Sequence, residues 1–145
     1  MGHLCLIILD CAEESKDLKS IMKIFDISNK LVLCENNQPL QIAIASHSIW
    51  REPLMWEAAI KILSEQELSL NLRFSLNYLE MLDEIKKKEV EVFTNKVLYF
   101  AKNMKQLQLS LDKFRQAIAN VARNKGMETS VIYQLMTKVD EITTN

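Results

Sequence analysis

A series of ten apolar residues in the second half of the chain constrains the fold more than any other feature. Intervals of three and four positions alternate along it: Val90, Phe93, Val97, Phe100, Met104, Leu107, Leu111, Phe114, Ile118 and Val121. Such intervals place side chains on one face of an α-helix, as at the a and d positions of a coiled coil. The series therefore predicts one long helix over 89–125, in which the 32 residues from Val90 to Val121 span about 48 Å at 1.5 Å per residue. Gly126 follows directly, where a left-handed residue commonly ends a helix.

The scarcity of glycine and proline indicates that the rest of the chain is helical as well. Only two of each occur in 145 residues, too few for the many tight turns of a β-sandwich or barrel. Further helices are predicted after Ser15 as an N-cap, from Pro53 onward, and after Thr129. We expect an all-α fold, an antiparallel helical bundle or short α-superhelix of about five to seven helices around the long helix.

The segment 31–45 has a second interpretation. The run Leu31-Val32-Leu33 and the alternating residues Leu40, Ile42 and Ile44 lie on either side of a polar cluster, as in a β-hairpin. The alanines in this segment and the low glycine content favour a helix. A minor hairpin near 31–45 is therefore kept as the alternative.

The chain shows no linker, repeat or low-complexity stretch, so 1–145 is interpreted as a single helical domain. Met1–His3 resembles a vector remnant, and we expect the whole to be a fragment of a larger protein. No apolar run approaches the length of a membrane span, and no signal peptide is recognisable. Three cysteines, Cys5, Cys11 and Cys34, cannot all pair within one chain. Reduced thiols and an intracellular, cytoplasmic location are expected.

Catalytic chemistry finds little support in the sequence. His3 and His47 are the two histidines, and they form no zinc-binding or protease motif. No glycine-rich phosphate loop occurs either. A cysteine paired with His47 is the one conceivable nucleophile, and a small buried side chain explains each cysteine more simply. We therefore expect no catalytic residue, no metal and no cofactor.

The apolar series suits an internal seam better than a zipper between chains. Residues flanking it are mixed, small or neutral, whereas a parallel dimer needs complementary charges there. Any stretch left uncovered would form a groove for a partner's amphipathic helix, with Phe100 and Leu107 in contact. Trp50 and Arg51 form a second candidate contact, since tryptophan and arginine are enriched at interface hot spots. The expected function is protein binding, as a scaffold, adaptor or regulatory module, to another protein or to a second copy.

Positive charge is concentrated in the predicted long helix. Between 86 and 125 there are 10 basic residues against 3 acidic ones. Six define a candidate basic face: Lys96, Lys102, Lys105, Lys113, Arg115 and Arg123. The alternative function is peripheral binding to an anionic lipid surface through this face. Nucleic acid is not expected as a partner, because the whole chain carries a net charge of −1.

Overall fold

The computed structural model describes residues 2–32, 38–71 and 78–144. Within these ranges the chain forms α-helices and one short 3-10 helix, without any strand. The elements are α1 (Gly2–Ser15), α2 (Leu18–Val32), α3 (Gln38–Ala45), η1 (Ser48–Arg51), α4 (Pro53–Asn71), α5 (Tyr78–Gln106), α6 (Asp112–Asn124) and α7 (Thr129–Thr144). The predicted all-α helical bundle is confirmed.

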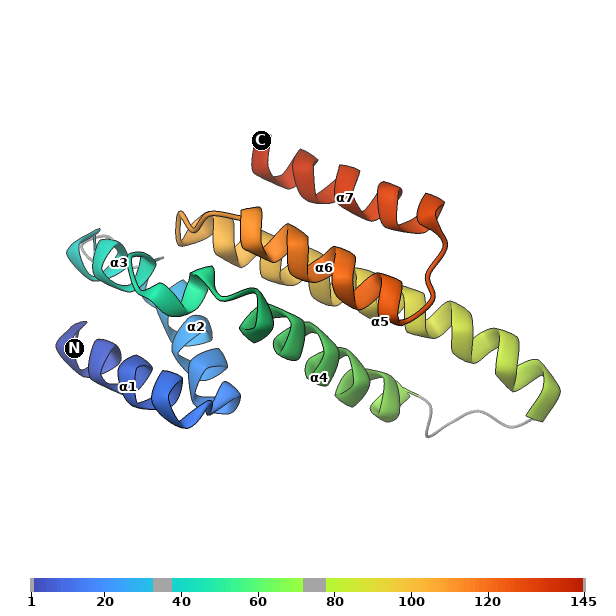
Figure 1. Ribbon diagram of the computed structural model, residues 1–145, viewed down its shortest axis with the longest axis horizontal. Coiled ribbons are helices and arrows are strands. Elements are labelled where there is room, and N and C mark those ends of the chain that lie inside the picture. The colour runs from blue at the N-terminus through green and yellow to red at the C-terminus, as the bar shows by residue number, and fades with distance from the viewer. Residues whose placement is uncertain (1, 33–37, 72–77, 145) are drawn as a thin grey trace.

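The helices form two groups that share one core (Figure 1). α1, α2 and α3 pack against one another at the end where the chain begins, and α4 to α7 occupy the rest. α4 contacts both α5 and α6, and α7 packs on α5. The buried apolar cluster takes side chains from every helix, α1 to α7. Hydrophobic burial therefore joins the two groups.

Trp56 on α4 lies at the centre of this core. Its side chain is fully buried, and four aromatic rings surround it at centroid distances between 5.1 and 5.9 Å. They belong to Phe25 on α2, Trp50 on η1, Phe100 on α5 and Phe114 on α6. Tilted and edge-to-face contacts of this kind add stability beyond the buried area. One side chain thus fixes the positions of five elements.

The single helix predicted over 89–125 is wrong, because the chain turns back between α5 and α6. Gln108 adopts a left-handed backbone, with φ of 58°. Its N–H donates to the carbonyl of Lys105 at 2.9 Å, and the N–H of Leu109 donates to that of Met104 at 2.9 Å. This pair of bonds is a Schellman motif, which ends a helix by satisfying its last carbonyls. Gly126 ends α6 in the same way, as predicted, with φ of 70°.

Aromatic packing explains why the helix breaks where no glycine or proline stands. Phe100 and Phe114 both contact Trp56, and their own ring centroids are 6.2 Å apart. Fourteen residues of continuous helix would separate them by about 21 Å along the axis. Only a reversal of the chain brings both rings to one tryptophan. The burial gained offsets the cost of a left-handed glutamine.

Two local predictions before Pro53 are also corrected. Ser15 is the last residue of α1 rather than an N-cap. Asp17 caps α2 instead, accepting the backbone N–H of Ser20 at 3.2 Å and its hydroxyl at 2.6 Å. The hairpin near 31–45 is wrong wherever the structure describes that segment, because α2 runs to Val32 and α3 is helical from Gln38. Residues 33–37 lie outside the described ranges. Pro53 begins α4, as predicted.

Replacing Gln108 with glycine tests the chain reversal. Glycine adopts a left-handed backbone without steric cost, so Gln108→Gly should raise the free energy of unfolding by about 0.5–1 kcal/mol. Gln116→Gly is the matched control at an exposed position inside α6, and it should lower that energy by about 1 kcal/mol. Urea denaturation measures both. Destabilisation by both changes would indicate a continuous helix.

Removing Asp17 should destabilise the protein in a pH-dependent way. The hydroxyl and backbone N–H of Ser20 hold the pKa of the Asp17 carboxyl below its ordinary value. The cap therefore contributes stability above about pH 4, the unfolded pKa of aspartate, and loses it as pH falls further. Asp17→Ala should lower the melting temperature at pH 7, and the difference should shrink toward pH 2. Asp83→Ala, at an exposed position on α5, is the control for loss of a surface carboxylate, and it should leave the melting temperature at pH 7 close to that of the parent.

Candidate partner-binding site

Three of the four predicted partner-binding side chains are closed off from solvent. Trp50 is 2% exposed, Phe100 1% and Leu107 0%, whereas Arg51 is exposed. The apolar series packs internally, as its flanking positions favoured, so Phe100 and Leu107 line no open groove. This corrects the expected contact surface, because the protein's own helices occupy it.

Both tryptophans serve the core, with their polar atoms paired internally. The indole N–H of Trp50 donates to the carbonyl of Ile44 at 2.7 Å. That of Trp56 donates to the carbonyl of Trp50 at 2.9 Å. Buried indole groups need such partners, since an unpaired buried donor is costly. The two bonds also fix η1 between α3 and α4.

The predicted basic face is divided between two antiparallel helices, and half of it is engaged within the protein. Lys96 pairs with Glu67 of α4 at 2.9 Å, and Lys105 donates to the carbonyl of Ile142 in α7 at 2.8 Å. Arg115 of α6 pairs with Asp140 of α7. The remaining three side chains are exposed and have no ion pair with any described residue: Lys102, Lys113 and Arg123.

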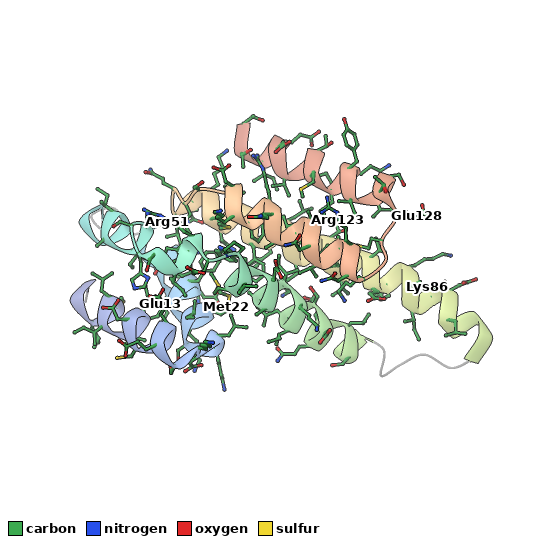
Figure 2. All side chains as sticks on the ribbon, viewed as in Figure 1. Glu13, Met22, Arg51, Lys86, Arg123 and Glu128 are labelled. Carbon is green, nitrogen blue, oxygen red and sulfur yellow. The ribbon has the colours of Figure 1, made fainter. Side chains whose placement is uncertain are left out.

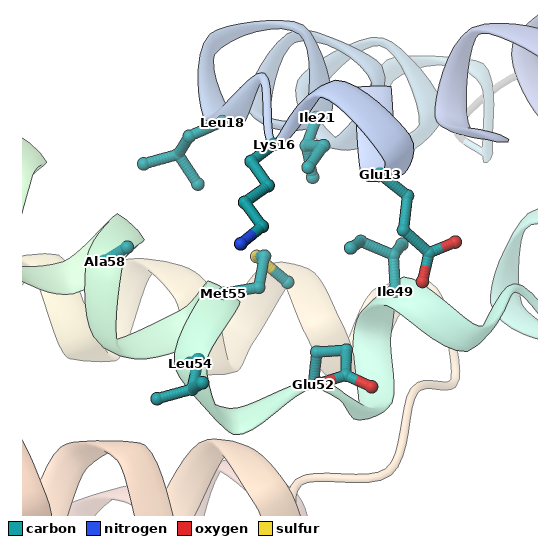
Figure 3. Close-up of a pocket in the computed structure, with 9 residues that line it drawn as sticks. All are labelled: Glu13, Lys16, Leu18, Ile21, Ile49, Glu52, Leu54, Met55 and Ala58. Atoms are coloured by element: carbon teal, nitrogen blue, oxygen red, sulfur yellow. The ribbon is translucent and has the colours of Figure 1, made fainter. Parts of the chain in front are cut away.

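A hollow of about 340 Å³, here called the α4 groove, opens between the α1–α2 turn, η1 and α4 (Figure 3). Its lining is mainly apolar: Leu18, Ile21, Ile49, Leu54, Met55 and Ala58. Three charged residues complete it, Glu13, Lys16 and Glu52. Figure 3 shows the Lys16 side chain reaching across the hollow toward Met55, with both glutamates on the side nearer η1. An apolar floor with a charged rim is typical of a binding site.

Lys16 reaches the groove from an unfavourable backbone conformation. It ends α1 in a Schellman motif, with φ of 55°. A left-handed backbone costs most residues about 1–2 kcal/mol, and glycine is the usual occupant of this position. The turn itself therefore gives no reason for a lysine at this position.

Leu54 connects the α4 groove with a second hollow. It is 73% exposed and lines both the groove and a hollow of about 390 Å³ between α4 and α6. The second hollow is more polar, with Glu57, Lys61, Glu65 and Lys125 among its lining. Together they form a surface with an aliphatic ridge and charged margins on one side of α4.

Two predicted site residues from different parts of the chain meet at a third hollow. Arg51 and Lys113 both line a hollow of about 400 Å³, beside Trp50. Figure 2 shows Arg51 where α3 and η1 approach the α5–α6 turn, and Arg123 toward the other end of α6. The sequence assigned Arg51 and Lys113 to separate surfaces, and the chain reversal brings them together.

One cluster has the residue types of a metal site. Single ligand atoms of Asp10, Glu13 and His47 lie within 4.8 Å of one another. However, His47 Nδ1 accepts the backbone N–H of Ile49 at 3.1 Å, while Nε2 lies 2.8 Å from Asp10. A backbone N–H can only donate, so the neutral ring carries its proton on Nε2. A metal ion on Nε2 would displace that proton to Nδ1, which could then no longer accept the backbone N–H of Ile49. Both ring nitrogens are engaged in this way, so neither is free to activate a cysteine. The arrangement serves to join α1 to η1.

Comparison of the chain with protein-family models, curated proteins and solved structures finds no match. Among the described residues, no helix is both long and apolar enough to cross a bilayer.

The sequence of α4 contains one signal for the α4 groove. Apolar residues of the helix after Pro53 occur on more than one face: Leu54, Met55, Ala58, Ala59, Ile60, Ile62 and Leu63. A helix apolar on several faces either is buried all round or exposes one face. Leu54 and Ile62 are exposed, at 73% and 42%. Which face is exposed depends on α2, α5 and α6, and the helix alone does not determine it.

Truncating Phe100 distinguishes a core residue from a groove residue. Phe100→Ala removes a buried ring that contacts Phe25, Trp56 and Phe114, so the free energy of unfolding should fall by about 3–5 kcal/mol. Tyr99→Phe is the control at the half-exposed neighbour. It removes only the hydroxyl bond to Asp26, so the cost should stay below about 1.5 kcal/mol. Equal, small effects in chemical denaturation would contradict the burial of Phe100.

Proposed function

We propose that this chain is a non-catalytic protein-interaction module whose α4 groove receives the apolar face of an amphipathic helix from a partner protein. The exposure of Leu54 carries the proposal, because a large aliphatic side chain stands between two hollows. Full burial of such a side chain is worth about 1.5–3 kcal/mol. A partner covering Leu54 gains part of that energy.

The floor of the α4 groove fits an aliphatic or aromatic anchor. Ile21 and Met55 are almost fully buried beneath it, and methionine adapts its shape to different partners. Helices recognised in grooves present apolar side chains at intervals of three and four residues. One anchor would enter the groove while the next lies against Leu54.

Charge at the rim indicates which residues flank the anchor. Glu13 and Glu52 reach the side nearer η1 from opposite walls of the groove (Figure 3), and Glu13 also accepts the hydroxyl of Ser48 at 3.3 Å. A lysine or arginine of the partner is favoured there. Lys16 extends across the middle of the hollow and favours an acidic residue beyond the anchor. Such complementary charges set orientation and association rate more than affinity.

The distribution of basic side chains supports a protein partner over a lipid surface. Lys96, Lys105 and Arg115 already contact groups within the protein. Membrane adsorption depends on several cations presented on one face. A basic face of which half is engaged by contacts within the protein is a weaker basis for function than the α4 groove.

Free thiols favour an intracellular setting for this interaction. Cys5 is buried and Cys11 is exposed, and neither forms a disulfide. Structural disulfides form in oxidising compartments, and an exposed free thiol there is open to oxidation. We place the module in the reducing interior of a cell.

Selection of amphipathic peptides from a display library tests the proposal. The library fixes apolar residues at intervals of three and four and randomises the other positions. Binders should carry a basic residue on one side of the anchor, and Leu54→Asp should weaken them at least tenfold by fluorescence anisotropy. The reason is that a carboxylate on the ridge opposes burial of an apolar face.

Ile62→Asp is the matched control for this experiment. Ile62 is an exposed aliphatic residue two turns further along α4 and lines neither hollow. Both variants should keep helical circular dichroism and a melting temperature close to that of the parent. Peptides that lose affinity equally to both variants, or a library that yields no binder, would contradict the proposal.

A further inference from the structure

The hollow beside Arg51 and Lys113, here called the Arg51 pocket, is separate from the α4 groove. It opens where the end of α3, η1 and the α5–α6 turn meet, and its volume is about 400 Å³. None of the residues that line it lines the α4 groove. Trp50, Leu109 and Ala45 supply apolar walls, and the first two are buried and firmly placed in the core.

Positive charge dominates this pocket. Arg51 and Lys113 come from η1 and α6, both are exposed, and neither forms an ion pair with a described residue. Asp112 is the one carboxylate in the lining, and it accepts the hydroxyl of Ser110 at 3.3 Å. Two cations therefore face a cavity that holds one carboxylate. The charge of the cavity is complementary to an anion.

We propose that the Arg51 pocket binds the anionic side chain, carboxylate or phosphate, of an acidic peptide segment in a partner protein. Arg51 offers a planar fork of donors that suits two oxygens, and Lys113 adds a mobile point charge. The apolar walls contact the carbon atoms next to the anionic group. The volume lies near the lower end of the range for ligand sites, which suits a single side chain and its neighbours.

The fixed backbone at this pocket supports a binding role. Trp50 is tied to α3 through its indole N–H, and the Schellman motif fixes Gln108 and Leu109. The backbone segments that carry Arg51 and Lys113 therefore adjoin fixed structure and need no rearrangement on binding. Preorganised sites bind more tightly because less motion is lost on association.

Peptide titration followed by amide chemical shifts tests this inference. The probes are three peptides of one otherwise neutral sequence, with serine, glutamate or phosphoserine at the centre. Shifts should be confined to 50–51 and 108–113 and should occur with both anionic peptides, strongest with phosphoserine. The serine peptide should give none. Binding should weaken between ~0.05 and ~0.5 M salt.

Charge-removing variants localise the binding. Arg51→Gln or Lys113→Gln should each weaken the phosphoserine peptide about tenfold, the loss expected for one charge-assisted hydrogen bond. Lys102→Gln and Arg123→Gln are matched controls at exposed positions outside the pocket, and they should leave the affinity unchanged. Equal losses in all four variants would show unspecific charge attraction and overturn the proposal.

Two further titrations, with inorganic phosphate and with anionic vesicles, test whether the pocket binds an anion that does not belong to a peptide. Inorganic phosphate that binds as tightly as the phosphoserine peptide would show a small-anion site and contradict a peptide function. Vesicles of phosphatidylcholine with about 30% phosphatidylserine would overturn the proposal if they bind through Arg51 and Lys113 while the peptides do not. Leu54→Asp should leave the phosphoserine peptide unaffected, so failure of the α4 groove proposal remains distinguishable.

Discussion

The contact of Phe100 and Phe114 with one tryptophan is the constraint on which the rest of the structure depends. Both rings lie within 5.7 Å of Trp56, although they belong to one uninterrupted apolar series. The chain must therefore reverse between them, which places α5 and α6 on either side of the same core. With α6 in this position, Lys125 reaches Glu89 at 3.1 Å, and α7 returns along α5.

This reversal also decides which surfaces remain for binding. Side chains that a straight helix would have presented along one groove are buried, whereas α4 keeps an open apolar surface around Leu54. The same turn carries Lys113 to the neighbourhood of Arg51. η1 separates the two sites, contributing Ile49 to the α4 groove and Trp50 to the Arg51 pocket. Its position is fixed by the two indole hydrogen bonds.

The sequence predicted burial better than it predicted the path of the backbone. Periodicity identifies the apolar face of a helix, and Phe93, Val97, Phe100, Met104 and Leu107 are all buried. It carries no information on a break at Gln108, because no residue there disfavours a helix strongly and long-range aromatic contacts decide the outcome. The candidate sites were even harder to predict from the sequence than the path of the backbone. Each combines segments far apart in sequence, so its residues could be recognised singly, as Arg51 and Lys113 were, but not as a pair.

A distance between spin labels on α5 and α6 tests the chain reversal most directly. Nitroxides at Glu91 and Arg123, both exposed, would be attached to a variant in which the three native cysteines are replaced by alanine. Double electron–electron resonance should give a distance below about 30 Å, as expected for helices in one bundle. A continuous helix would separate the labelled positions by about 48 Å. That longer distance would contradict the aromatic core and, with it, both proposed binding surfaces.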